Sequence, residues 1–142
     1  MRICLVSSSF YPATFYGGPI SACWDLSKKL VEKGNEIYVS TTNANGTKKL
    51  DIECNRYLEK STNVLVKYYN EQLLNKFSFS FLFGIWSDIK KSEVVYVQYL
   101  FHYTVLLALL CSVIQSKQII ICPRGSFSVF TLSNKFIFIK SL

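Results

Sequence analysis

The chain has 142 residues, of which 50% are hydrophobic, 15% aromatic and 18% charged. This length suits one domain with a sizeable core, and the composition excludes general disorder, collagen-like chains and low-complexity chains. Sixteen Lys and Arg against nine Asp and Glu give a net charge of +7, spread along the chain without a dense basic block, so no nucleic-acid partner is expected.

The five cysteines and the single histidine bear on metals and on the cellular compartment. No two cysteines form a Cys-x-x-Cys pair, and His102 has no neighbouring set of ligands, so no metal site is expected. An odd number of cysteines, unpaired by spacing, fits a reducing compartment, and the apolar run after Met1 is too short for a signal peptide. These observations favour a cytoplasmic protein.

The first elements in chain order are a predicted strand, a helix and a second strand. Residues 3–6 form a short apolar run that serines end, which is typical of a strand buried on both faces of a parallel sheet. A helix is predicted to begin near Pro19, where the missing N–H suits a first turn, and to end at a cap at Gly34. The second strand is predicted over residues 37–42.

The stretch that follows, residues 43–63, is polar and rich in turn residues. Asn45 and Gly46 predict a tight turn. A short helix is expected around residues 53–58. The next apolar run, residues 64–66, predicts a third strand.

A helix over residues 71–91 is predicted by one apolar stripe. The members of the stripe are Leu74, Phe77, Phe81, Ile85 and Ile89. Phe79, Phe83 and Trp86 lie off it, so the helix is apolar over an unusually wide arc. Two interpretations stay open: a core helix, or a membrane-surface element with basic residues at the interface. The basic residues beside it are Lys76, Lys90 and Lys91.

Residues 94–116 contain no Asp, Glu, Lys or Arg, and their number satisfies the length rule for a transmembrane helix. However, the segment starts with β-branched and aromatic residues and has several polar residues in its first half. This pattern favours a strand over residues 94–98 followed by a helix over residues 104–114. A final strand is predicted over residues 118–122.

Strands that alternate with helices at this spacing predict an α/β fold with a parallel sheet. The five expected parallel strands are residues 2–7, 36–41, 64–68, 94–98 and 118–122. Ligands of such sheets bind beyond the carboxyl ends of the strands. The loops after the first, fourth and fifth strands are therefore the places to look for a site.

The loop after the first strand ends in two consecutive glycines, Gly17 and Gly18, before a helix start. Glycines at that position allow an anion to approach backbone N–H groups, which the helix dipole favours. A flexible strand-to-helix turn explains the same pair equally well. The loop is neither a G-x-G-x-x-G motif nor a P-loop, so the signatures of dinucleotide binding and P-loop chemistry are missing.

Several segments, in order and at consistent spacing, carry a family resemblance. They are residues 1–7, 11–12, 17–19, 26–37, 94–101 and 120–126. Together they resemble the N-terminal half of family 4 glycosyltransferases of the GT-B fold. The run Pro123-Arg124-Gly125 is similar to that family's Ser-Pro-Arg-Gly segment, and residues 94–101 stand in the place of its fourth-strand motif. The resemblance spans nearly the whole chain and does not indicate the substrate.

The resemblance implies a Rossmann-like parallel sheet flanked by helices, forming an incomplete N-terminal half of a GT-B enzyme. In this family the N-terminal half mainly receives the acceptor, and a C-terminal half with a Glu-x7-Glu pattern holds the nucleotide-sugar donor. Nothing in residues 1–142 matches that second half. The chain is therefore expected to be a single, partial domain that lacks the donor-binding domain and is inactive alone. The implied function is hexosyl transfer from a nucleotide-sugar to a polysaccharide or glycolipid acceptor, without a cofactor or metal.

The same resemblance implies roles for individual residues. Gly17 and Gly18 would face the donor diphosphate, and Arg124 would contact an anion or the acceptor, unless it is a structural arginine that ties down a loop. Gln98 stands where family members often have histidine, and glutamine can bind a sugar hydroxyl but cannot carry a proton. His102 is the other catalytic candidate, with a packed histidine as the alternative.

Two other functions remain open at this point. The chain could be a non-catalytic, truncated remnant, or a small membrane protein that spans the bilayer with residues 94–116. Related enzymes that act on lipid-linked acceptors suggest a third feature, which is peripheral contact with the inner face of the plasma membrane.

Overall fold

The structure is a computed structural model that describes residues 1–71 and 77–124, so Leu74, Lys76 and Gly125 lie outside the described residues. The described part is a mixed α/β fold in which helices cover both faces of a mostly parallel sheet. The strands of this sheet are β1 (Arg2–Val6), β2 (Glu36–Thr42), β5 (Tyr57–Ser61), β6 (Val64–Tyr69), β7 (Val94–Gln98) and β8 (Gln118–Cys122).

The sheet has the strand order β5-β6-β2-β1-β7-β8. All five strands expected from the sequence are present, and every pairing among them is parallel. Numbered among themselves, these five follow the order 3-2-1-4-5, which is compatible with a Rossmann-like sheet. The strand order reverses between β1 and β7, and the carboxyl ends of such neighbours form the crevice where α/β sheets bind ligands.

The edge strand β5 corrects the sequence analysis, because the helix expected around residues 53–58 does not form. Residues 57–61 instead pair antiparallel with β6. Asn63 in the connecting turn has a φ of 57°, a left-handed conformation that asparagine tolerates better than most residues. The segment thus obtains its hydrogen bonds from the neighbouring strand rather than from a helix.

A second, two-stranded sheet contains β3 (Ala44–Asn45) and β4 (Lys48–Lys49). These strands pair antiparallel, and Gly46 between them has a φ of 70°. The turn predicted at Asn45 and Gly46 is therefore confirmed.

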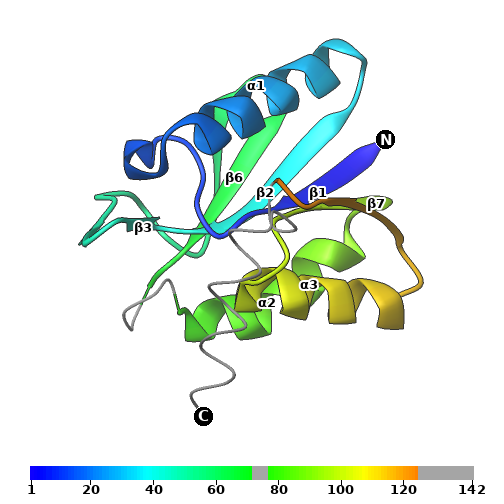
Figure 1. Ribbon diagram of the computed structural model, residues 1–142. Coiled ribbons are helices and arrows are strands. Elements are labelled where there is room, and N and C mark those ends of the chain that lie inside the picture. The colour runs from blue at the N-terminus through cyan, green and yellow to red at the C-terminus, as the bar shows by residue number, and fades with distance from the viewer. Residues whose placement is uncertain (72–76, 125–142) are drawn as a thin grey trace.

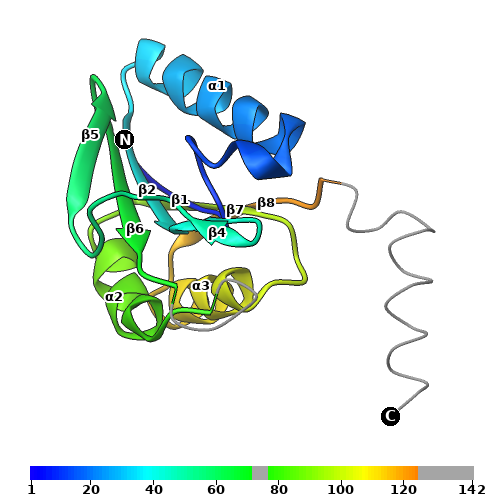
Figure 2. The ribbon, with the colours of Figure 1, turned by 90° about the vertical axis from the view of Figure 1, so that its left-hand side faces the viewer.

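Helix α1 (Gly18–Glu32) covers one face of the sheet, with a short 3-10 turn, η1 (Thr14–Tyr16), before it (Figures 1 and 2). Pro19 lies in its first turn, as predicted. Gly34 follows its last turn with a φ of 80°, and its N–H donates to the carbonyl of Val31 at 2.8 Å. The expected glycine cap is therefore confirmed.

Helices α2 (Phe79–Lys90) and α3 (Tyr103–Ile114) cover the opposite face (Figure 2). The helix predicted over residues 71–91 is shorter than expected because Ser78 caps it, accepting a hydrogen bond from the Phe81 N–H at 3.3 Å. Within this helix, the members of the predicted stripe are buried; they are Phe81, Ile85 and Ile89. Residues 94–116 divide into β7 and α3, as the strand-and-helix interpretation predicts. None of the helices in residues 1–71 and 77–124 is long and apolar enough to cross a bilayer.

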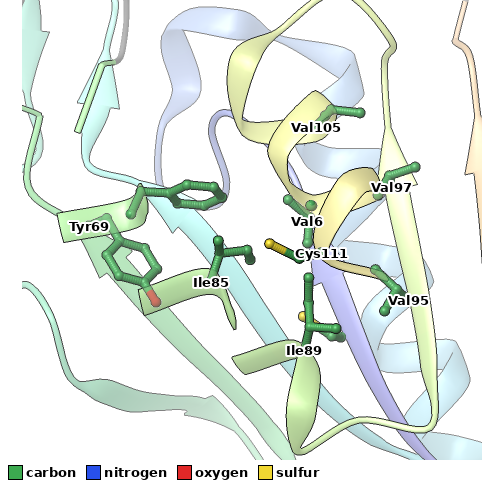
Figure 3. Packing of buried hydrophobic residues seen from close by; sticks show 11 residues of the cluster. Val6, Tyr69, Ile85, Ile89, Val95, Val97, Val105 and Cys111 are labelled. Atoms are coloured by element: carbon green, nitrogen blue, oxygen red, sulfur yellow. The ribbon is translucent and has the colours of Figure 1, made fainter. Parts of the chain in front are cut away.

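Each face of the sheet has its own hydrophobic core. The core under α2 and α3 includes Val6, Val95 and Val97 from the sheet, and Figure 3 shows these side chains beside Ile85 and Cys111 of the helices. The core under α1 contains the alternate strand residues, among them Leu5, Val39 and Val66, with Phe10 and Cys23. Because successive strand residues point to opposite faces, both cores require near-continuous apolar strands.

A buried polar cluster interrupts the core beneath α2, centred on Asp88. The Asp88 carboxylate is 1% exposed and accepts hydrogen bonds from the Ser40 hydroxyl at 2.8 Å, from the Lys67 ammonium at 3.1 Å and from the Tyr69 hydroxyl. Gly84 makes room for this contact, since a Cβ there would lie 2.3 Å from the Tyr69 hydroxyl. The cluster joins α2 to β2 and β6.

Candidate functional site

The carboxyl edge of the parallel sheet carries a row of buried polar side chains. They are Ser7, Ser8 and Ser9 after β1, Thr42 and Asn43 at the end of β2, Glu71 after β6, and Gln98 at the end of β7. Buried polar residues are less common than buried apolar ones and therefore more informative. Their position is where ligands of parallel sheets bind.

Hydrogen bonds between neighbouring loops hold this row in place. The Ser7 hydroxyl donates to the Ser9 carbonyl at 2.7 Å, and the Thr42 hydroxyl donates to the Ser8 carbonyl at 2.8 Å. The Asn43 side-chain oxygen accepts from the Glu71 N–H at 2.8 Å. The ends of β1, β2 and β6 thus form a cross-linked polar floor.

Two side-chain atoms in this row have no hydrogen-bond partner within the described residues. These are the hydroxyl oxygen of Ser9 and the amide nitrogen Nε2 of Gln98, on residues that are 2% and 1% exposed. A buried polar group without a partner costs about 1–3 kcal/mol. Gln98 ends β7 and Ser9 lies in the loop that follows the adjacent strand β1, so both atoms belong to the carboxyl edge of the sheet.

The glycine loop lies at the same edge, between β1 and α1. Gly17 has a φ of 66° and a ψ of −141°, which requires glycine, and its N–H donates to the Thr14 carbonyl at 3.0 Å. Gly18 is the first residue of α1, and a Cβ added to it would meet no described atom within 4 Å. The space beside Gly18 at the positive end of the helix dipole is therefore open, whereas the Ile20 N–H donates to the Gly17 carbonyl at 3.0 Å and Pro19 has no N–H.

Arg124 follows β8 and has a φ of 44°. Its position is indicated by its effect on the thiol of Cys23 in α1: burial raises the pKa of that thiol to about 12, and the Arg124 charge opposes the increase. Arg124 therefore lies near α1, at the same edge as the glycine loop. Its Nε has no partner within the described residues. The Tyr99 N–H donates to the Cys122 carbonyl at 3.0 Å and joins the loops after β7 and β8.

His102 has a structural role at the start of α3. Its Nδ1 accepts a hydrogen bond from the Thr104 N–H at 3.4 Å and lies 2.9 Å from the Thr104 hydroxyl. Its ring also packs against Tyr103, with centroids 5.0 Å apart. His102 thus caps the helix on the α2–α3 side, whereas Arg124 lies on the α1 side.

Of the residues singled out in the sequence, Gly17, Gly18, Gln98 and Arg124 all lie at the carboxyl ends of β1, β7 and β8 or in the loops that follow. Sequence reasoning did not single out Ser9, whose burial only the folded structure reveals. A usable signal was present, because three serines directly follow the buried apolar strand β1.

Two further observations concern metals and known proteins. In the described parts of the chain, no three His, Cys, Asp or Glu side chains gather where they could hold a metal ion. No protein-family model matches the chain, and no curated protein matches it.

Proposed function

We propose that this chain is the acceptor-side half of a GT-B glycosyltransferase, which transfers a hexosyl group from a nucleotide-sugar to a saccharide or lipid-linked acceptor. The observation that carries the proposal is the pair of buried, unpartnered atoms Ser9 Oγ and Gln98 Nε2 where the strand order reverses. The proposal also uses the family resemblance of the surrounding segments, since a row of polar residues at a sheet edge does not by itself select a sugar.

The proposed roles follow from the chemistry of each group. In transfer, the acceptor hydroxyl oxygen bonds to the anomeric carbon as the bond from that carbon to the diphosphate oxygen breaks. The diphosphate leaves with the electron pair of that bond, and the hydroxyl proton passes to the leaving diphosphate. The first turn of α1 after Gly17 and the Arg124 guanidinium would favour the diphosphate charge. Gln98 and Ser9 would hold sugar hydroxyls by hydrogen bonds. A donor-binding domain outside residues 1–142 would complete the cleft, and the transfer would then depend on positioning and electrostatic stabilisation.

A non-catalytic binding module is the second candidate. It is favoured by Gln98, which lies at the end of β7 and cannot carry a proton. This candidate shares the binding site and differs only in chemistry. Binding therefore tests both functions, and product formation separates them.

The structure provides an optical reporter for the binding test. Trp24 in α1 stacks on Tyr11 of the glycine loop, with ring centroids 4.8 Å apart. The other tryptophan, Trp86, lies on the opposite face of the sheet, so a Trp86→Phe background leaves Trp24 as the only tryptophan. Titration of this chain with a panel of nucleotide-sugars and saccharides should change the Trp24 emission in a saturable way.

Gly18→Val is the test substitution, because its Cβ would enter the space beside the first turn of α1 without a described atom within 4 Å. We expect it to weaken binding at least tenfold while the circular dichroism spectrum is retained. Lys29→Val, at an exposed position of the same helix, is the matched control and should bind as the parent does. Equal binding by the two variants would show that the glycine loop is only a turn.

A further inference from the structure

The outward side of α2 carries three large aromatic side chains. Phe79 is 50% exposed, Phe83 is 82% exposed and Trp86 is 44% exposed. Their spacing of four and three residues places them on one side of the helix, opposite the buried Phe81, Ile85 and Ile89. Such exposure is unusual for a set of aromatic residues on one helix face.

The outward side of α3 is aliphatic. Leu106, Leu110, Val113 and Ile114 are each more than half exposed and recur at helical spacing. The opposite side of the helix, including Val105 and Ala108, is buried against the sheet. Together, α2 and α3 therefore carry seven of the thirteen exposed large hydrophobic residues in the described structure.

The two stripes form one surface, which we call the α2–α3 outer face. Both views of the ribbon show α2 and α3 side by side on the side of the sheet away from α1 (Figures 1 and 2). Contacts between the helices agree with this arrangement, because the Gln115 side chain donates to the Trp86 carbonyl at 3.2 Å. The Tyr103 ring also packs against Phe81, with centroids 6.0 Å apart.

The only exposed charge within the two helices is positive, and Glu93, just beyond the end of α2, is half exposed and pairs with Arg2 at 3.5 Å. The only acidic residue in the two helices is Asp88, which is buried and paired with Lys67, and α3 has no charged residue. Lysines gather where the helices end: Lys90 and Lys91 are exposed, and the Lys117 ammonium lies 3.2 Å from the Lys90 carbonyl. The outer face is thus apolar with a basic rim at one end.

We propose that the α2–α3 outer face docks on the interface of an anionic lipid bilayer, with both helices parallel to the membrane plane. Each helix has 12 residues and is about 18 Å long, which suits lying in the interface. Protruding side chains such as Phe83 insert between lipid headgroups and acyl chains. This region is fluid, so it needs no pocket that is complementary in shape to the side chain. Anionic headgroups pair with the lysine rim, whereas helices α2 and α3 of a second copy carry no exposed carboxylate for Lys90.

The experiment is sedimentation of the chain with vesicles made of equal parts phosphatidylcholine and phosphatidylglycerol. We expect binding that weakens as salt is added, and much weaker binding to phosphatidylcholine alone. Phe83→Ser should lower the partition coefficient about tenfold, because it removes one interfacial aromatic side chain. Lys90→Ala should lower it about fivefold.

Matched controls lie on the other side of the sheet. Phe15 in η1 is 67% exposed and Lys33 ends α1, so Phe15→Ser and Lys33→Ala should leave vesicle binding unchanged. Equal losses in Phe83→Ser and Phe15→Ser, or no binding to either vesicle, would overturn the proposal. A dimer in light scattering that Phe83→Ser dissociates, without vesicle binding, would assign the face to a second copy instead. None of these outcomes depends on glycosyl transfer.

Discussion

Replacing Asp88 by Asn removes the charge at the centre of the buried cluster that joins α2 to β2 and β6. In the native chain the Asp88 carboxylate lies 3.1 Å from the Lys67 ammonium and 2.8 Å from the Ser40 hydroxyl. The Asp88 side chain is inaccessible to solvent, and that of Lys67 is only 15% exposed. The substitution therefore leaves the lysine charge largely buried without its counter-ion.

The expected magnitude follows from this burial. Removing one partner of a buried ion pair destabilises a protein by about 3–5 kcal/mol. A domain of ordinary stability unfolds with a free energy of about 5–15 kcal/mol, so Asp88→Asn should remove a large part of it. The matched control is Asp25→Asn on α1, where the pair with Lys28 is 2.9 Å long but its side chains are 64% and 43% exposed. An exposed pair of this kind contributes less than about 1 kcal/mol.

Urea unfolding followed by circular dichroism measures both variants. A second arm adds Lys67→Met to Asp88→Asn, and the double variant should recover part of the lost stability because the unpaired ammonium is gone. A loss below about 1 kcal/mol in Asp88→Asn, or a loss equal to that of Asp25→Asn, would refute the view that a buried charge pair anchors α2.

Three further predictions concern packing, pH and activity. Gly84→Ala should lower the melting temperature, despite a helix-propensity gain of about 0.5–1 kcal/mol, because its Cβ would lie 2.3 Å from the Tyr69 hydroxyl; an increase would contradict this packing. Burial raises the pKa of the Cys4 thiol from 9.0 to about 12, so this thiol stabilises the fold below pH 9 and loses that contribution as pH rises to 12. Urea unfolding across this pH range should show a smaller fall in the free energy of unfolding for Cys4→Ala than for the native chain. On the proposed function, the purified chain with nucleotide-sugars and membrane-derived acceptors should form no product above a protein-free control, because an acceptor-side domain alone would not position the donor.

The parallel sheet could be predicted from the sequence because its strands are continuous apolar runs, buried on both faces. Residues 94–98, for example, combine β-branched and aromatic side chains and are a strand as predicted. The edge strand β5 could not be predicted in the same way. Residues 57–61 are polar and only partly buried, so their conformation depends on pairing with β6 rather than on their own pattern.

The site shows a similar division between local pattern and tertiary context. Strand topology was enough to place Gly17, Gln98 and Arg124 at one edge of the sheet. The unpartnered Ser9 hydroxyl depends on how neighbouring loops meet, which the sequence does not encode locally. The capping role of His102 is local, because the Thr104 N–H lies two residues away, but histidine is not among the usual N-cap residues. The roles of these residues in binding and transfer stay predictions.

The most direct test of the proposed binding site is the stability of Gln98→Met, measured by thermal unfolding with and without a panel of nucleotide-sugars and saccharides. Methionine has a similar volume and no amide, so the variant removes the unpartnered Gln98 Nε2 from the carboxyl end of β7. We predict that without ligand the variant is more stable than the native chain, by about 1–3 kcal/mol. We also predict that ligand stabilises only the native chain. A variant that is less stable without ligand, or that gains as much from ligand as the native chain does, would contradict the assignment of this edge as a ligand site.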